Sequence, residues 1–147
     1  MSAPFPPIAE LVPHAGPALL LDAVLEHADG RIRTRARVSA ASRYFVPGRG
    51  LPSWVGLELM SQAIAAYAGL KARREQRPPR AGMLLGTRRY ETRLSYFPEG
   101  AELEIECIRD FGDDSGVAAC ACTIQSGGET WAEATLIIVE VDEEGRP

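Results

Sequence analysis

The feature that most constrains this chain is an apolar run over residues 51–70 that carries a single charge, Glu58. Its apolar side chains fall on every side of a helix rather than on one stripe, and a helix of this kind is normally buried. The run is long enough to span a bilayer. However, Glu58, Gln62 and several small residues lie within it, and alternating strand patterns follow it. We therefore expect a helix buried in a globular domain.

Glu58 permits two interpretations. As a structural residue it lies near the helix N-terminus, where the macrodipole favours a carboxylate. As a functional residue it is a carboxylate in apolar surroundings, which disfavour its charged form and suit it to proton transfer. Gln62 lies one turn further on and shares its face. We favour the functional interpretation because an unpaired buried glutamate is rare.

The composition predicts one domain over residues 1–147, with an acidic, frayed tail over 142–147. A net charge of −4 gives no indication of a nucleic-acid partner. The three cysteines, Cys107, Cys120 and Cys122, have the wrong spacing for a metal site. They fit reduced thiols in a cytoplasmic protein, and the N-terminus lacks the pattern of a secretion signal. We expect no metal and no cofactor.

Periodicity predicts an α+β domain in which an antiparallel sheet wraps one long central helix, with a second copy covering the remaining helix face in a two-fold homodimer. The helix is expected to begin at Ser53 as N-cap and to end near Arg73 to Gln76. The other expected elements are a short helix over 6–12, a hairpin over 18–27 and 31–38, a loop over 39–51, a turn over 96–100, and strands over 83–94, 101–110, 117–125 and 130–141.

Two motifs carry a resemblance to a known family. Residues 11–24 read LVPHAGPALLLDAV, similar to LPHRxPxLLVDRV, and residues 52–63 read PSWVGLELMSQA, similar to PGVLxxEAMAQ. In this order and spacing they resemble the 3-hydroxyacyl-acyl-carrier-protein dehydratases, which have the hotdog fold. The resemblance covers roughly residues 8–140.

The chain departs from that family at the chemistry. Family members carry a catalytic histidine in a GHFPGxPxxPG loop before the helix, and here Tyr44 stands at its position. The family's Pro-Gly before the helix is Pro52-Ser53. This variant helix start is similar to the dehydratase-like hotdog proteins of aryl polyene and other pigment pathways.

The resemblance implies that the protein is a lyase that dehydrates 3-hydroxyacyl thioesters. This reaction needs an acid for the leaving hydroxyl, a base for the 2-proton and donors for the thioester oxygen. We assign the acid to Glu58 and the donors to the free backbone amides at the helix start, near Trp54 and Val55. Gln62 is expected beside the substrate.

The base is the missing part of this site. His14, in the first motif, either takes over as the base opposite Glu58, within one chain or across a dimer interface, or is a structural or tunnel-lining residue. Tyr44 either donates a hydrogen bond to the substrate or packs in its loop. His27 is expected to be exposed at a strand end and to have no function.

The expected partner is an acyl carrier protein with its phosphopantetheine-bound chain. Four cations would meet that arm or the acidic carrier, or are solvated surface charges: Arg74, Arg77, Arg88 and Arg89. Two other functions stay open. One is an acyl thioesterase in which Glu58 acts without a histidine, and the other is a non-catalytic acyl-binding hotdog subunit.

Overall fold

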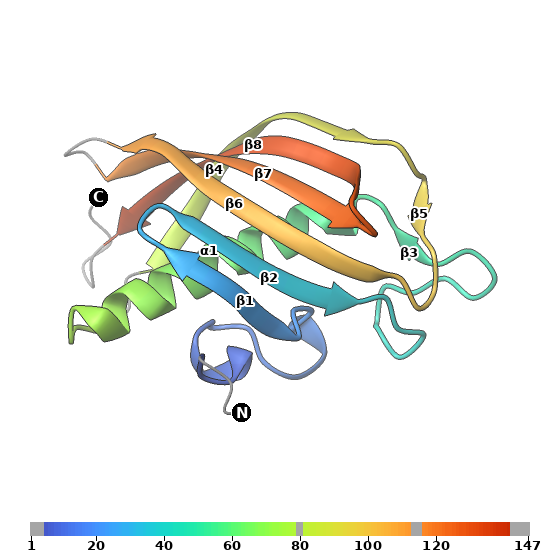
Figure 1. Cartoon of the computed structure of the whole chain (residues 1–147), viewed down its shortest axis with the longest axis horizontal. Coiled ribbons are helices and arrows are strands. Elements are labelled where there is room, and N and C mark those ends of the chain that lie inside the picture. The colour runs from blue at the N-terminus through green and yellow to red at the C-terminus, as the bar shows by residue number, and fades with distance from the viewer. Residues whose placement is uncertain (1–4, 79–80, 113–115, 142–147) are drawn as a thin grey trace.

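The computed structural model describes residues 5–78, 81–112 and 116–141. A single long helix, α1 (Val55–Arg74), lies in the concave face of a curved six-stranded sheet (Figure 1). Every strand pair in this sheet is antiparallel. In sheet order the strands are β1 (Ala23–Ala28), β2 (Arg31–Arg37), β6 (Glu102–Gly112), β7 (Val117–Ser126), β8 (Glu129–Val141) and β4 (Ala81–Thr92). The predicted α+β architecture, with a sheet wrapped around one helix, is confirmed.

The period-two pattern of β2 explains which face of the sheet meets the helix. Ile32, Thr34 and Ala36 are buried on the concave face. The arginines between them point outward, and Arg33 bonds carboxylates on both neighbouring strands, Glu26 on β1 and Glu104 on β6. These surface ion pairs add little stability, roughly 0–1 kcal/mol each. They hold the charged side chains of β2 on the outer face of the sheet, away from the face that packs on α1.

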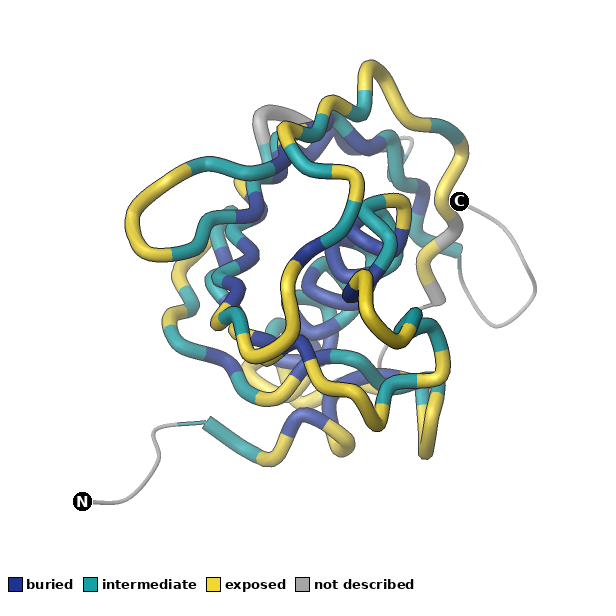
Figure 2. Tube along the Cα trace, turned by 90° about the vertical axis from the view of Figure 1, so that its right-hand side faces the viewer, coloured by how far each residue is buried: buried dark blue, intermediate teal, exposed yellow. Residues whose placement is uncertain are grey.

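The inner side of α1 forms the centre of the core. Leu59, Met60, Ala63 and Ala66 are at most 1% exposed, and burial of a leucine or methionine side chain contributes about 1.5–3 kcal/mol. Figure 2, turned by 90° from Figure 1, shows buried parts of the trace gathered in the middle of the molecule. The opposite side of α1 is only partly covered within one chain. The prediction that the sheet buries the helix over most of its surface is therefore right for the inner side and leaves the outer side open.

The chain enters α1 differently from the prediction. The N-cap is Trp54 rather than Ser53, and no side chain caps the helix. Instead the Ser53 and Trp54 carbonyls accept hydrogen bonds from the amides of Gly56 and Leu57. A serine before an apolar run is a good capping signal, but the backbone turn at Ser53 satisfies these amides without its hydroxyl.

Two very short strands brace this entrance. β3 (Leu51–Pro52) pairs with β5 (Tyr96–Phe97), where a loop and a turn were predicted. Leu51 and Phe97 are buried, and two-residue strands are too short to give a periodic pattern. The N-terminal segment likewise forms two single 3-10 turns, η1 (Ile8–Glu10) and η2 (Gly16–Ala18), in place of the predicted helix.

The remaining elements agree with the sequence to within a few residues. The hairpin of β1 and β2, the end of α1 at Arg74 and the strands β4, β6, β7 and β8 are where the pattern placed them, except that β1 begins at Ala23 rather than at residue 18. Residues 113–115, which follow β6, and the tail over 142–147 lie outside the described residues. Within the described ranges, no helix has the length and apolar character needed to cross a membrane.

Candidate active site

His14 and Glu58 meet within one chain. The His14 Nε2 atom lies 3.4 Å from Glu58 Oε1, and their side chains are 27% and 40% exposed. His14 belongs to the loop before η2, and Glu58 points from the first turn of α1. The two motifs, far apart in the sequence, thus bring an imidazole and a carboxylate together, and these two side chains are called the His14–Glu58 pair below.

Gln62 holds this pair in place. Its side chain is completely buried, and its amide nitrogen donates to Glu58 Oε1 at 3.0 Å and to the Ala18 carbonyl at 2.7 Å. Its oxygen accepts from the Leu20 amide at 2.9 Å. One side chain therefore orients the carboxylate and ties the first motif to the helix.

A close crossing of backbones places the first motif over α1. A Cβ on Gly69 would overlap the Leu11 carbonyl, so glycine alone lets the chain pass this near the helix. Leu11 and Val12 are buried in the core, and His14 follows them after Pro13. The Nδ1 atom of His14 is also buried, and it has no hydrogen-bond partner in the described part of the chain.

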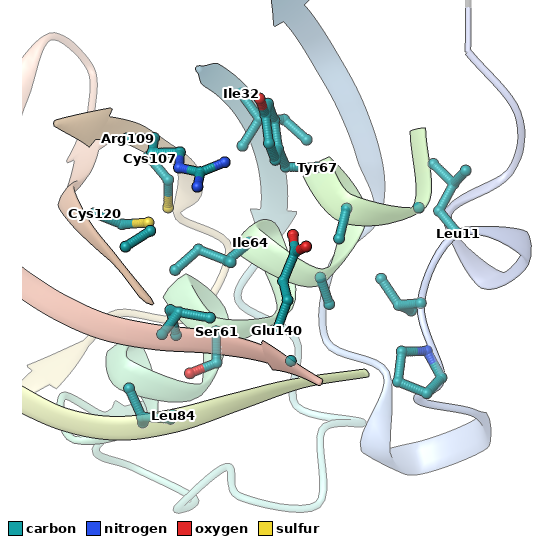
Figure 3. Close-up of a pocket in the computed structure, with 18 of the residues that line it drawn as sticks. Leu11, Ile32, Ser61, Ile64, Tyr67, Leu84, Cys107, Arg109, Cys120 and Glu140 are labelled. Atoms are coloured by element: carbon teal, nitrogen blue, oxygen red, sulfur yellow. The ribbon is translucent and has the colours of Figure 1, made fainter. Parts of the chain in front are cut away.

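A cavity of about 560 Å³ opens beside His14 and runs between the second half of α1 and the sheet (Figure 3). Its walls are largely apolar, while Arg109, Tyr67 and Glu140 add polar groups to its lining. Other lining residues are Leu11, Ile32, Ser61, Ile64, Leu84, Cys107 and Cys120. A pocket of this size and character suits an acyl chain.

The helix start offers free donors. The amides of Trp54 and Val55 donate no hydrogen bond within the described part of the chain, whereas the next two amides bond the Ser53 and Trp54 carbonyls. Tyr90, from β4, donates its hydroxyl to the Ser53 carbonyl. Burial raises the pKa of Tyr90 to about 12, so this phenol remains a donor at neutral pH.

The structure corrects the predictions for two residues. Glu58 is neither unpaired nor buried within the single chain, because the outer side of α1 is open. His27 is not a freely exposed residue: its ring packs 5.2 Å from the Tyr67 ring, and both its nitrogens are buried without a partner in the described residues. Burial, and then the nearby Arg74 charge, lower the pKa of His27.

In the described residues, Tyr44 is not bonded to the His14–Glu58 pair. Its ring packs edge-on against Trp54, with centroids 5.5 Å apart, and the Arg43 guanidinium lies over the Tyr44 ring at 5.5 Å from its centroid. No hydrogen bond or ion pair joins Tyr44 to Glu58 or His14 in the described part of the chain. Within one chain it therefore lies with the residues that pack around the helix entrance.

The four candidate docking arginines fall into two groups. Arg74 ends α1, whereas Arg89 precedes Tyr90, which reaches the start of α1. A 20-residue helix is about 30 Å long, so these groups lie at opposite ends of the domain. Arg77 bonds Glu75 at 2.6 Å, and Arg89, 83% exposed, pairs with Glu91 at 3.3 Å.

The cysteines contribute no ligand cluster. All three cysteines are reduced and buried, and the Cys122 thiol together with burial raises the pKa of Cys107 well above its usual value. No group of three histidine, cysteine, aspartate or glutamate side chains suited to a metal occurs in residues 5–78, 81–112 and 116–141.

A family model described as ApeP dehydratase, of the ApeP-like family, matches residues 6–146. The chain belongs to the ApeP-like dehydratase family. This membership confirms the predicted resemblance to the hotdog dehydratases of aryl polyene pathways. The activity of this family is dehydration. No protein with curated function matches the sequence.

Solved structures confirm the hotdog fold. The ApeI:P dehydratase heterocomplex of Xenorhabdus doucetiae contains a chain 23% identical, with a TM-score of 0.89 and coverage of 96% of this chain and 95% of that one. Cj0977 of Campylobacter jejuni is 15% identical, with a TM-score of 0.68 and coverage of 92% and 96%. A hypothetical thioesterase of Streptococcus pneumoniae, solved with coenzyme A, is 12% identical, with a TM-score of 0.64 and coverage of 84% and 87%.

Proposed function

We propose that this ApeP-like protein dehydrates 3-hydroxyacyl thioesters carried on acyl carrier protein, in the assembly of an aryl polyene or a similar pigment. The observation that carries the proposal is the contact between His14 Nε2 and Glu58 Oε1, 3.4 Å apart in one chain. It provides a base and an acid together although the loop histidine of related dehydratases is replaced by Tyr44.

The proposed reaction needs three kinds of group. His14 takes the proton from C2, and the resulting charge on the thioester oxygen is held by the Trp54 and Val55 amides. Glu58 gives its proton to the 3-hydroxyl, the C3–O bond breaks, and water leaves as the C2–C3 double bond forms. Because His14 and Glu58 are in contact, the proton taken from C2 can return directly to the carboxylate. Gln62 holds the carboxylate throughout.

The cavity beside His14 is the proposed place for the acyl tail. The thioester then lies at the helix start, and the tail runs under the second half of α1. This orientation places the phosphopantetheine arm on the outside of the helix start. Of the candidate cations, Arg88 and Arg89 lie near that end, so we propose that they, rather than Arg74 and Arg77, meet the carrier or its arm.

The edge strand β4 is the proposed site for a second hotdog subunit. It ends the sheet, so one row of its backbone groups is unpaired, and Leu84 and Leu85 are 46% and 57% exposed. Unpaired edges with exposed apolar residues favour strand addition. A homodimer remains our prediction, and the ApeI:P heterocomplex makes a different hotdog subunit the alternative. The three reduced cysteines fit a cytoplasmic location.

Turnover of a 3-hydroxyacyl-carrier-protein thioester tests the proposal, with enoyl product measured by mass spectrometry. Glu58→Gln and His14→Ala are each expected to lower kcat by about 10²- to 10⁴-fold. His27→Phe, which changes the other histidine, is the matched control and should remain active. Near-normal turnover of His14→Ala would remove His14 from the mechanism.

The two other functions give different results in the same assay. A thioesterase releases a free thiol without forming an enoyl product. The likeness to the hypothetical thioesterase of Streptococcus pneumoniae is a likeness of fold and does not favour this activity. A non-catalytic subunit shows no turnover alone and gains it when a second hotdog subunit is added.

Carrier docking has its own test. Arg88→Glu with Arg89→Glu is expected to raise KM for the carrier-bound substrate but not for the same acyl chain on free pantetheine. Arg74→Glu with Arg77→Glu serves as the matched charge control. Equal effects of the two double variants would contradict the proposed docking position.

A further inference from the structure

We propose that Tyr90 is a positioning residue that sets the direction of the Trp54 amide, the donor assigned above to the thioester oxygen. This inference rests on the proposed function in that one assignment. Tyr90 lies on β4, far from both motifs in the sequence, and within the described residues no hydrogen bond or ion pair joins it to His14 or Glu58.

The contact itself provides the first argument. The Tyr90 hydroxyl donates to the Ser53 carbonyl, and the Ser53 carbonyl and the Trp54 N–H belong to the same planar peptide unit. Fixing the carbonyl therefore fixes the N–H, which points in the opposite direction. The Gly56 amide donates to the same carbonyl at 3.0 Å. Two donors on one carbonyl also polarise the peptide and strengthen its N–H as a donor.

The rest of the Ser53 residue is held as well. Its own amide donates to the Ser95 carbonyl at 3.0 Å, beside the short strand pair at the helix entrance. The Trp54 amide itself donates no hydrogen bond in the described part of the chain. The peptide is thus restrained on the carbonyl side and open on the N–H side, as a preorganised donor requires.

The backbone of β4 is bent at the point where Tyr90 leaves it. Arg88 pairs with Thr135 and Glu91 with Glu133, so β4 has one extra residue in this interval. Arg89, within the interval, has a φ of 55°, which is costly for a residue other than glycine. Bulges of this kind redirect side chains and are common next to active sites.

The helix start is shaped to admit the phenol. A Cβ on Gly56 would overlap the Tyr90 hydroxyl, and it would lie 3.1 Å from the ring carbon that carries this hydroxyl. Glycine in a helix costs roughly 0.5–1 kcal/mol relative to alanine. At Gly56 this cost is offset because the absence of a Cβ lets the Tyr90 hydroxyl reach the Ser53 carbonyl.

Tyr90→Phe removes the hydroxyl and keeps the ring, and Tyr96→Phe is the matched control. Tyr96 lies on β5 near the same entrance, and its hydroxyl makes no hydrogen bond in the described residues. We expect Tyr90→Phe to lower kcat about tenfold with KM nearly unchanged, since loss of a whole oxyanion donor costs about 10²- to 10³-fold. Tyr96→Phe should behave like the unchanged protein.

A second measurement separates positioning from folding and from catalysis. A saturated acyl-pantetheine thioester, ¹³C-labelled at its carbonyl, binds without reacting because it has no 3-hydroxyl. Its infrared carbonyl band should shift to lower frequency on the unchanged protein and on Tyr96→Phe, and shift less on Tyr90→Phe.

The outcomes distinguish this inference from the proposed function. An active protein whose Tyr90→Phe variant keeps both kcat and the carbonyl shift overturns the role of Tyr90 alone. A protein without dehydration, alone or with a second hotdog subunit, overturns the proposed function, and the carbonyl shift then decides on Tyr90. Absence of any carbonyl shift on the unchanged protein overturns the Tyr90 role as well.

Discussion

Gln62→Glu is the substitution that most directly tests the hydrogen-bond network of the candidate site. It preserves the shape of the side chain and replaces the amide NH₂ with an oxygen. That nitrogen now donates to the Ala18 carbonyl at 2.7 Å and to Glu58 Oε1 at 3.0 Å. After the change, oxygen would face oxygen at both places, while the bond from the Leu20 amide could persist.

The magnitude follows from these two contacts. The Ala18 carbonyl left without its donor costs about 1–3 kcal/mol, and the lost bond to the partly exposed Glu58 costs about 0.5–1.5 kcal/mol, so the free energy of unfolding should fall by about 1.5–4.5 kcal/mol. This is a large part of the 5–15 kcal/mol typical of a domain. The introduced carboxyl lies buried beside Glu58, which favours its protonated form in the folded protein. The loss is therefore smallest below the ordinary glutamate pKa of about 4.3 and grows as the pH rises.

Urea unfolding at about pH 7.5 and about pH 4.5 measures both effects. Gln76→Glu, at an exposed position just after α1, introduces the same charge without a buried contact. We expect a clear deficit for Gln62→Glu relative to this control at the higher pH and a smaller one at the lower pH. A difference within about 1 kcal/mol at the higher pH, the scale of a single net hydrogen bond, would refute the network.

Two further predictions address the packing and the pH response. Gly69→Ala should displace the Leu11 backbone and destabilise the fold by about 1–3 kcal/mol, whereas Gly86→Ala, with open space around its Cβ, should be tolerated; equal melting temperatures for the two would contradict the close crossing. Because burial and Arg74 lower the pKa of His27, its neutral form favours the folded state, so stability should fall as the pH drops below about 6.5. His27→Phe should show a smaller loss over that range in urea unfolding, and an unchanged pH dependence would contradict this assignment.

The wrapped-helix fold was predictable because its signals are local. An all-round apolar run over residues 51–70, followed by strictly alternating segments such as 101–110, leaves few ways to bury the helix. The strand and helix bounds agree with those patterns to within a few residues. The patterns missed the short pair β3 and β5, because two-residue strands have no period, and misplaced the N-cap, because a backbone turn at Ser53 replaces its side chain.

The site was predictable only in part. The motifs identified Glu58, His14 and Gln62 as candidates, but their spacing along the chain carries no information on distance in space. The 3.4 Å contact between His14 and Glu58 depends on the crossing of Leu11 over Gly69 and on the anchoring of the first motif by Gln62. Both are long-range contacts that form only when the helix and the loop pack together.

By itself, the sequence determined the fold class, the central helix and the residue types able to carry acid–base chemistry, because periodicity and residue chemistry are local properties. The tertiary structure decided which of them meet. It paired Glu58 with His14 rather than with Tyr44, left the outer side of the helix open, and brought Tyr90 from the bulged edge strand to the helix start. These outcomes depend on backbone paths through packed space, where one glycine or one extra strand residue decides which side chain reaches an atom.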